Sequence, residues 1–120
     1  MSAIANQVHL MLKKIFPANP HRRVFPEHYV QFKGARLFFD FYVKEMDVFI
    51  EVQGRQHTKF VKHFHGTKKN FDAQRYRDNL KLEYVQEQGM SLARFNYDEK
   101  ITEELVREKI SKAMEGCFYE

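Results

Sequence analysis

The spacing of apolar and polar positions predicts a helix followed by a hairpin at the start of the chain. Apolar side chains recur at every third or fourth position over residues 2–16, which is typical of an amphipathic helix, and two prolines follow it. Residues 28–32 and 36–43 are rich in aromatic and β-branched side chains. The Lys33-Gly34 dipeptide between them predicts that these two strands form a β-hairpin.

The remaining elements alternate between strand and helix. Residues 47–53 have a strong strand pattern, and residues 90–96 have a shorter one. Helical patterns occupy residues 68–88, ended by Gly89, and residues 101–114. Because a strand–helix–strand connection of this length favours parallel pairing, we expect the last strand to lie parallel to its neighbour. The predicted fold class is α/β, with a mixed sheet, the order α-β-β-β-α-β and a C-terminal helix.

A second hairpin brings two acidic side chains together. A turn at residues 45–46 places Val43 opposite Val48. The same register places Asp40 opposite Glu51, with the two carboxylates about 5 Å apart on one face of the sheet. Side-chain alternation predicts that the apolar side chains of the first of these strands share the opposite face: Leu37, Phe39, Phe41 and Val43.

Two directly opposed like charges destabilise a hairpin, so the acidic pair requires an explanation. One carboxylate can stay protonated with a raised pKa. Alternatively, a divalent cation lies between the two, and hard oxygen ligands of this kind suit Mg²⁺ or Mn²⁺. The third alternative involves no site: one carboxylate points to solvent or pairs with a nearby arginine.

The length and charge of the chain indicate a single domain with a polyanionic partner. Its 120 residues, 43% of them hydrophobic, fit one packed domain over residues 1–120. The net charge is +4, but residues 53–81 have eight Lys and Arg against two Asp, while residues 82–120 have a net charge of −4. Such a basic segment is typical of nucleic-acid binding, although a solvated surface with no partner has the same composition.

Other classes of protein are disfavoured. No apolar run reaches the roughly 18 residues of a membrane span, and residues 1–7 do not resemble a signal peptide. The single cysteine, Cys117, cannot form an internal disulfide. We therefore expect no membrane partner and a cytoplasmic protein, in the host-cell cytoplasm if a phage encodes it. Structural zinc is disfavoured because His57, His63 and His65 have no cysteine near them.

Four motifs follow one another in the middle of the chain: Arg36-Leu-Phe-Phe-Asp40, Phe-Ile-Glu51-Val-Gln53-Gly54-Arg-Gln-His57, Arg77-Asp78-x-x-Lys81 and Gly89-x-x-Leu92-x-Arg94. Together they resemble the PD-(D/E)XK nucleases, and more narrowly the small branch related to very-short-patch-repair endonucleases and phage EDxHD-type homing nucleases. The resemblance extends over residues 8–97. It implies a restriction-endonuclease-like α-β-β-β-α-β core and the activity of a metal-dependent DNA endonuclease.

The resemblance also implies which residues act. Asp40 and Glu51 match the metal-binding acids that hold Mg²⁺, for which Mn²⁺ can substitute. Gln53 occupies the place of the usual lysine and could orient the attacking water. His57 matches the histidine of the G-x-x-H signature and would act as general acid or base. Because Gln53 removes a cation, His57 or Lys81 would have to supply it.

Basic residues around these motifs are candidates for binding the DNA backbone. Phe60 and Phe64 lie among them in the sequence and would stack on bases or pin their loop to the core. We expect Asp78 to form a structural ion pair with Arg75, one helical turn away. The candidate backbone contacts are Arg55, Lys59, Lys62, Lys68, Lys69 and Lys81.

Two alternatives to a DNA endonuclease stay open. The chain could be a non-catalytic nucleic-acid-binding module, since Gln53 replaces the lysine and the first helix contains no glutamate. It could instead be a protein-interaction domain whose acidic C-terminal helix docks a partner. A chain of this size has little room for a recognition domain. Specificity would therefore come from DNA structure, a homodimer or a larger recombination, repair or packaging complex.

Overall fold

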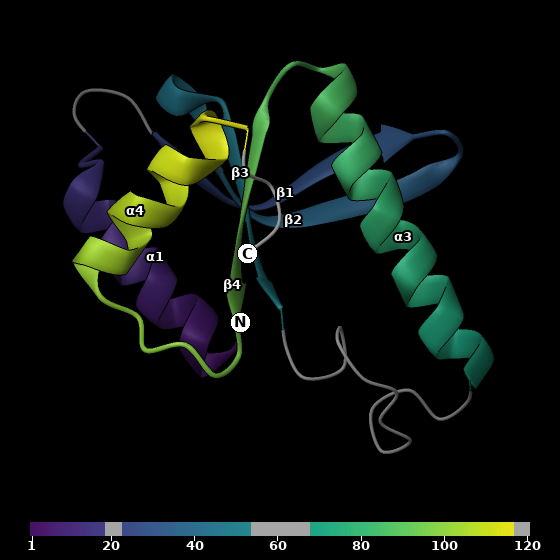
Figure 1. Ribbon diagram of the computed structural model, residues 1–120, viewed down its shortest axis with the longest axis horizontal. Coiled ribbons are helices and arrows are strands. Elements are labelled where there is room, and N and C mark those ends of the chain that lie inside the picture. Colours follow the sequence, from purple (N-terminus) through teal and green to yellow (C-terminus); the bar gives the residue numbers. More distant parts are fainter. Residues whose placement is uncertain (19–22, 54–67, 117–120) are drawn as a thin grey trace.

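The computed structural model describes residues 1–18, 23–53 and 68–116 as a four-stranded sheet between two layers of helix (Figure 1). Helices α1 and α4 cover one face of the sheet, and α3 covers the other. The predicted α/β class with a mixed sheet is therefore confirmed. The elements are α1 (Ala3–Ile15), β1 (Val24–Phe32), β2 (Ala35–Val43), the 3-10 turn η1 (Lys44–Met46), β3 (Val48–Gln53), α3 (Lys68–Glu87), β4 (Ser91–Asn96) and α4 (Glu103–Met114).

The strands lie side by side in the order β1-β2-β3-β4. The first three are antiparallel to one another, and β4 pairs with β3 in parallel, as predicted. The β1–β2 turn consists of Lys33 and Gly34, whose φ angles are 50° and 77°. Positive φ at both central residues is the property of the turns that suit two-residue hairpins, because their twist matches that of the strands.

The predicted register of the second hairpin is confirmed where the strands pair. Val43 lies opposite Val48, and the pairing ends at Phe41 and Ile50. Strand β2 continues beyond that point while still pairing with β1. The two central strands therefore share three residue pairs and then diverge at the next position, which is Asp40 on β2.

The prediction that the apolar side chains of β2 share one face is wrong. The ring of Phe41 lies 5.0 Å from that of His9 on α1, whereas the ring of Phe39 lies 6.2 Å from that of Tyr84 on α3. The change of face occurs between Phe39 and Phe41, where Asp40 and the residue opposite it, Glu27 with a left-handed φ of 51°, are missing from the β1–β2 pairing. The register is the same on both sides of this position, so the interruption is local and inserts no residue. Leu37 accordingly packs with Phe39, and Val43 packs with Phe41.

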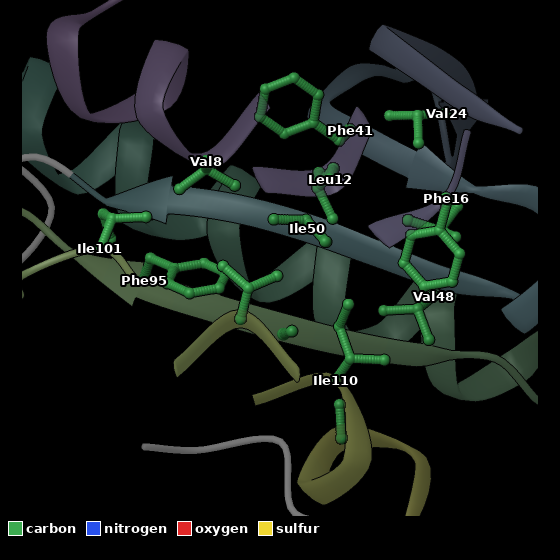
Figure 2. Packing of buried hydrophobic residues seen from close by; sticks show 14 residues of the cluster. Val8, Leu12, Phe16, Val24, Phe41, Val48, Ile50, Phe95, Ile101 and Ile110 are labelled. Carbon is green, nitrogen blue, oxygen red and sulfur yellow. The ribbon is translucent and has the colours of Figure 1, made fainter. Parts of the chain in front are cut away.

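The larger hydrophobic cluster lies between the sheet and helices α1 and α4 (Figure 2). Val8 and Leu12 of α1 point onto the strands, and Ile110 of α4 lies beside β4. The apolar face of α4 therefore belongs to the core, and its acidic residues lie at its exposed or half-buried positions. The smaller cluster on the opposite face consists of Leu37, Phe39, Phe49, Leu80, Val85 and Leu92.

The helix ends follow from local chemistry. The hydroxyl of Ser2 accepts a hydrogen bond from the Ala5 N–H, and that of Thr102 accepts one from the Leu105 N–H, both at 3.1 Å. Such N-caps satisfy backbone donors that a helix leaves free. Gly89, with φ 68°, follows the end of α3 as predicted.

The largest difference at a strand boundary is that β1 begins at Val24 rather than at residue 28, while the other strands begin within one residue of the prediction. Pro26 interrupts the strand pattern of the first residues of β1 in the sequence. Pro26 is tolerated because β1 is an edge strand. No helix within the described ranges is long and apolar enough to cross a membrane.

Leu12 tests the packing of α1, because its side chain is fully buried while Leu10, on the same helix, is 64% exposed. We expect Leu12→Ala to lower the free energy of unfolding by about 2–5 kcal/mol, since it leaves a cavity. Leu10→Ala is the matched control and should change stability by less than about 0.5 kcal/mol. Urea unfolding measures both, and equal effects would contradict this packing.

Candidate active site

A pocket of about 570 Å³ opens where β2 and β3 diverge. Asp40, Glu51, Gln53 and Lys81 all line it. These are four of the residues singled out from the sequence, and they come from β2, β3 and α3. The structure therefore brings the two acids, the strand glutamine and a helix lysine together around one cavity.

The side chain of Asp40 replaces a strand partner. Its Oδ2 accepts a hydrogen bond from the backbone N–H of Val52 at 2.7 Å. Beyond the Phe41–Ile50 pair that N–H has no carbonyl opposite it in β2, and an unsatisfied buried donor is costly. The carboxylate therefore satisfies the backbone at the point of divergence and is held in a fixed position at the pocket wall.

Glu51 is a buried acid with a buried partner. Its side chain is 7% exposed, and its Oε1 lies 2.9 Å from Nζ of Lys81, which is 13% exposed. The Lys81 ammonium also lies 5.6 Å from the centre of the Phe39 ring, within the range of a cation–π contact. This ion pair joins α3 to the centre of the sheet.

Burial raises the pKa of Glu51 to about 7. The charge of Lys81 and its hydrogen bond act in the opposite direction, while the nearby charges of Asp40 and Asp78 raise the pKa further. Burial prevails because removing a carboxylate from water disfavours its ionised form. Glu51 can therefore exist in either protonation state near neutral pH, as an acid–base group requires.

The sequence left three explanations for the acidic pair. The geometry supports part of the first, a raised pKa, and part of the third, pairing with a cationic side chain. The carboxylates are coupled, since the charge of Asp40 raises the pKa of Glu51, as the first explanation requires. Glu51 is also paired with a cation, although the cation is Lys81 rather than an arginine. Within the described residues no three His, Cys, Asp or Glu gather as a metal-binding group.

Several predicted residues lie outside the described residues: His57, Arg55, Lys59, Lys62, Phe60 and Phe64, with His63 and His65. Lys68 and Lys69 are exposed in the first turn of α3, and Lys68 pairs with Asp72 at 3.2 Å. Arg75 lies over the ring of Phe71, at 5.7 Å. Its expected ion pair with Asp78 stays a prediction.

Sequence reasoning assigned no site role to several residues that line the pocket: the first five residues of the chain, and Glu27, Phe38 and Tyr97. A signal for Glu27 was present, because a hairpin centred on Lys33-Gly34 places it opposite Asp40. Phe38 and Tyr97 are exposed aromatic residues, and nothing in their local pattern distinguishes them from core positions.

Arg94 also belongs to this neighbourhood. It is the residue directly beside Glu51 in the backbone register of the parallel β3–β4 pair. Leu92, two residues before it, packs on the α3 side, so alternation places Arg94 on the same side. Its Nε is buried and has no hydrogen-bond partner within the part of the chain that the structure describes.

Comparison with known proteins finds similarity to a viral protein. The chain is 36% identical over 64 residues to "Uncharacterized protein 307L" of Invertebrate iridescent virus 6. The matched segment covers 53% of this chain and 32% of the viral protein, so the chain corresponds to about a third of that protein's length. No family model matches the chain, and no solved structure matches it.

The raised pKa of Glu51 predicts a specific dependence of stability on pH. Glu51 has an ordinary pKa of 4.5 when unfolded and about 7 when folded, so the folded chain binds the proton more tightly. The free energy of unfolding should therefore fall as the pH rises from about 4.5 to about 7, and Glu51→Gln should remove that fall. Urea unfolding at several pH values measures the slope. Glu104→Gln, on the exposed face of α4, should retain it, and an unchanged slope in Glu51→Gln would contradict the assignment.

Lys81 should matter more for stability than an exposed lysine or arginine. We expect Lys81→Met to cost about 3–5 kcal/mol at pH 8, because it leaves the Glu51 charge buried and unpaired. Adding Glu51→Gln should recover part of that loss. Arg107→Met breaks an exposed 3.0 Å pair with Glu103 and is the control; it should cost less than about 1 kcal/mol. Additive effects of the Lys81 and Glu51 substitutions would exclude the pair.

Proposed function

We propose that the chain is a metal-dependent DNA endonuclease that hydrolyses phosphodiester bonds at the pocket around Asp40 and Glu51. We also propose that its sheet and helices are the restriction-endonuclease-like core of a PD-(D/E)XK nuclease. The contact between Lys81 and Glu51 supports this most. The resemblance requires a cation beside the second acid, Gln53 leaves the usual strand position without one, and Lys81 provides it from α3.

The donor set of the pocket fits Mg²⁺, which proteins hold through one or two carboxylates while it keeps several waters. Asp40 uses Oδ2 for the Val52 N–H, and Glu51 uses Oε1 for Lys81. The second oxygen of each carboxylate would then be the metal ligand, with Mn²⁺ as a substitute. A bound ion would lower the pKa of a coordinated water and polarise the phosphate.

Residues of the chain itself would position the reacting groups and stabilise charge. The backbone bond of Asp40 holds its carboxylate in place, which avoids reorganisation during the reaction. Lys81 would stabilise negative charge developing on the phosphate, and Gln53 would orient the water. His57 stays a candidate general acid or base from its motif.

The proposed partner is DNA, contacted by the basic residues named from the sequence. Lys68 and Lys69 are the exposed members of that set at the start of α3. A homodimer or a larger repair, recombination or packaging complex, and a cytoplasmic location, belong to the same proposal.

A non-catalytic nucleic-acid-binding module is the second candidate. The observation in its favour is that Lys81 already neutralises Glu51, so the buried acid has a counterion in the absence of a metal. In that case the residues of the pocket would serve only the stability of the fold. DNA binding would depend on salt but not on Mg²⁺.

Carboxylate-to-amide substitutions decide between these candidates. We expect Asp40→Asn and Glu51→Gln each to reduce Mg²⁺-dependent cleavage of plasmid and branched DNA by at least about 100-fold, because each removes a charge that acts in the transition state. Gel analysis of the products with Mg²⁺ or Mn²⁺ measures this, and Glu104→Gln is the control. Unchanged cleavage in Asp40→Asn would exclude the proposed site. Salt-dependent DNA binding without cleavage in any metal would favour the second candidate.

A further inference from the structure

We propose that the rim of the pocket binds unpaired nucleobases by stacking, so that the preferred DNA contains a single-stranded or unpaired stretch. The rim is defined here as Phe38 and Tyr97, which line the pocket, together with Tyr29, whose ring contacts that of Phe38. The inference deepens the proposed function by naming its substrate class. It rests on that function for the cleavage step alone, because base binding is measurable without cleavage.

Two rim residues form an exposed aromatic pair on the first hairpin. Tyr29 and Phe38 lie directly opposite each other on β1 and β2. Their ring centres are 5.1 Å apart and tilted by 53°, and they are 42% and 55% exposed. Phe38 also lines the pocket beside Asp40. An exposed aromatic pair next to a polar cavity is a feature of ligand surfaces more than of ordinary folds.

The third rim residue comes from the other side of the acids. Tyr97 directly follows β4, is 39% exposed and lines the same pocket. Because β3 lies between β2 and β4 in the sheet, the strand that contains Glu51 has Phe38 on one neighbouring strand and Tyr97 directly after the other. A DNA strand that crosses the pocket would therefore meet an aromatic ring on either side of Asp40 and Glu51.

The composition of the pocket favours a nucleotide over an apolar protein surface. The charged residues of its wall are Glu27, Asp40, Glu51 and Lys81, and the rest of its lining includes the apolar Met1, Ile4 and Val52. Covering those charges with apolar atoms would cost free energy without hydrogen bonds in return. A nucleotide combines a flat apolar base with a charged phosphate, and successive bases stack on aromatic side chains in proteins that bind single strands.

Charge along the chain supports the same ligand. The most basic segment, residues 53–81 with a net charge of +6, begins at Gln53 and ends at Lys81. Both of these residues line the pocket. The two end residues of this basic segment therefore lie at the cavity, and a basic segment of this density is typical of polyanion binding.

Stacking also selects unpaired over paired DNA. In a duplex both faces of each base are covered by neighbouring base pairs, so a protein ring can stack only on a base that is extruded or already single-stranded. An aromatic rim beside a cleavage site would thus distinguish single-stranded or gapped DNA from an intact duplex. Asp40 and Glu51 would serve the cleavage of either kind of DNA.

Fluorescence anisotropy with a labelled single-stranded oligodeoxynucleotide and its blunt duplex tests the inference, with EDTA present to prevent cleavage. We expect Phe38→Ala and Tyr29→Ala each to weaken single-strand binding at least about fivefold. Binding of the duplex should change less than about twofold. Phe38→Tyr should retain the affinity, whereas Phe38→Leu, which is apolar without a ring, should lose it. Tyr76→Ala is the matched control, because Tyr76 is a 61% exposed aromatic residue of α3 that does not line the pocket.

Three outcomes would overturn the inference. One is unchanged single-strand affinity in Phe38→Ala, and another is an equal loss for both DNA forms. The third is a dimer in sedimentation that Phe38→Ala converts to a monomer, since a second copy would then occupy the rim. Phe38-dependent binding without cleavage in any metal would reject the endonuclease and keep the inference. Cleavage that needs Asp40, together with single-strand affinity that does not need Phe38, would do the reverse.

Discussion

The hydrogen bond from the Val52 N–H to the Asp40 carboxylate is the constraint on which the site depends. Two antiparallel strands can separate inside a protein only if their freed backbone groups find other partners. At this point a side chain provides the partner, at 2.7 Å. The separation leaves room for a pocket, and the same bond fixes one of its acids. Fold and candidate chemistry therefore share a single interaction.

Glu51, the second acid of the site, lowers the stability of the folded chain when it is ionised. Burial makes ionised Glu51 costly, and Lys81 compensates only in part, so the pKa stays raised. An apolar pair at these positions would pack the sheet against α3 without that penalty. The cation that stabilises the carboxylate in the absence of ligand is the one that would meet a bound phosphate. Structure and proposed function therefore use the same ammonium group.

Much of the fold could be predicted from the sequence because turns and periodicity are local. The two-residue turn at Lys33-Gly34 determined one register, and the placement of Val43 opposite Val48 determined the other. The faces of the β2 side chains were predicted wrongly because the pairing with β1 is interrupted at Asp40, opposite the left-handed Glu27, and the local pattern of β2 does not mark that position. The Lys81–Glu51 contact joins residues far apart in sequence, and helical periodicity gave no reason to choose Lys81 over its neighbours. Within the site, then, strand alternation predicted the two acids, whereas Lys81 was predicted only through the resemblance to a known family.

The parallel pairing of β3 and β4 has a consequence for how such a domain can change. Parallel neighbours require a long crossover, and here both ends of the basic segment are fixed, one by the strand at Gln53 and one by the ion pair at Lys81. The entropic cost of closing a loop grows only with the logarithm of its length. Changes of length between β3 and the start of α3 can therefore leave the acids in place, whereas an inserted residue within α3 would rotate Lys81 away from Glu51. Under the proposed function, recognition could then diverge from chemistry along one short stretch of chain.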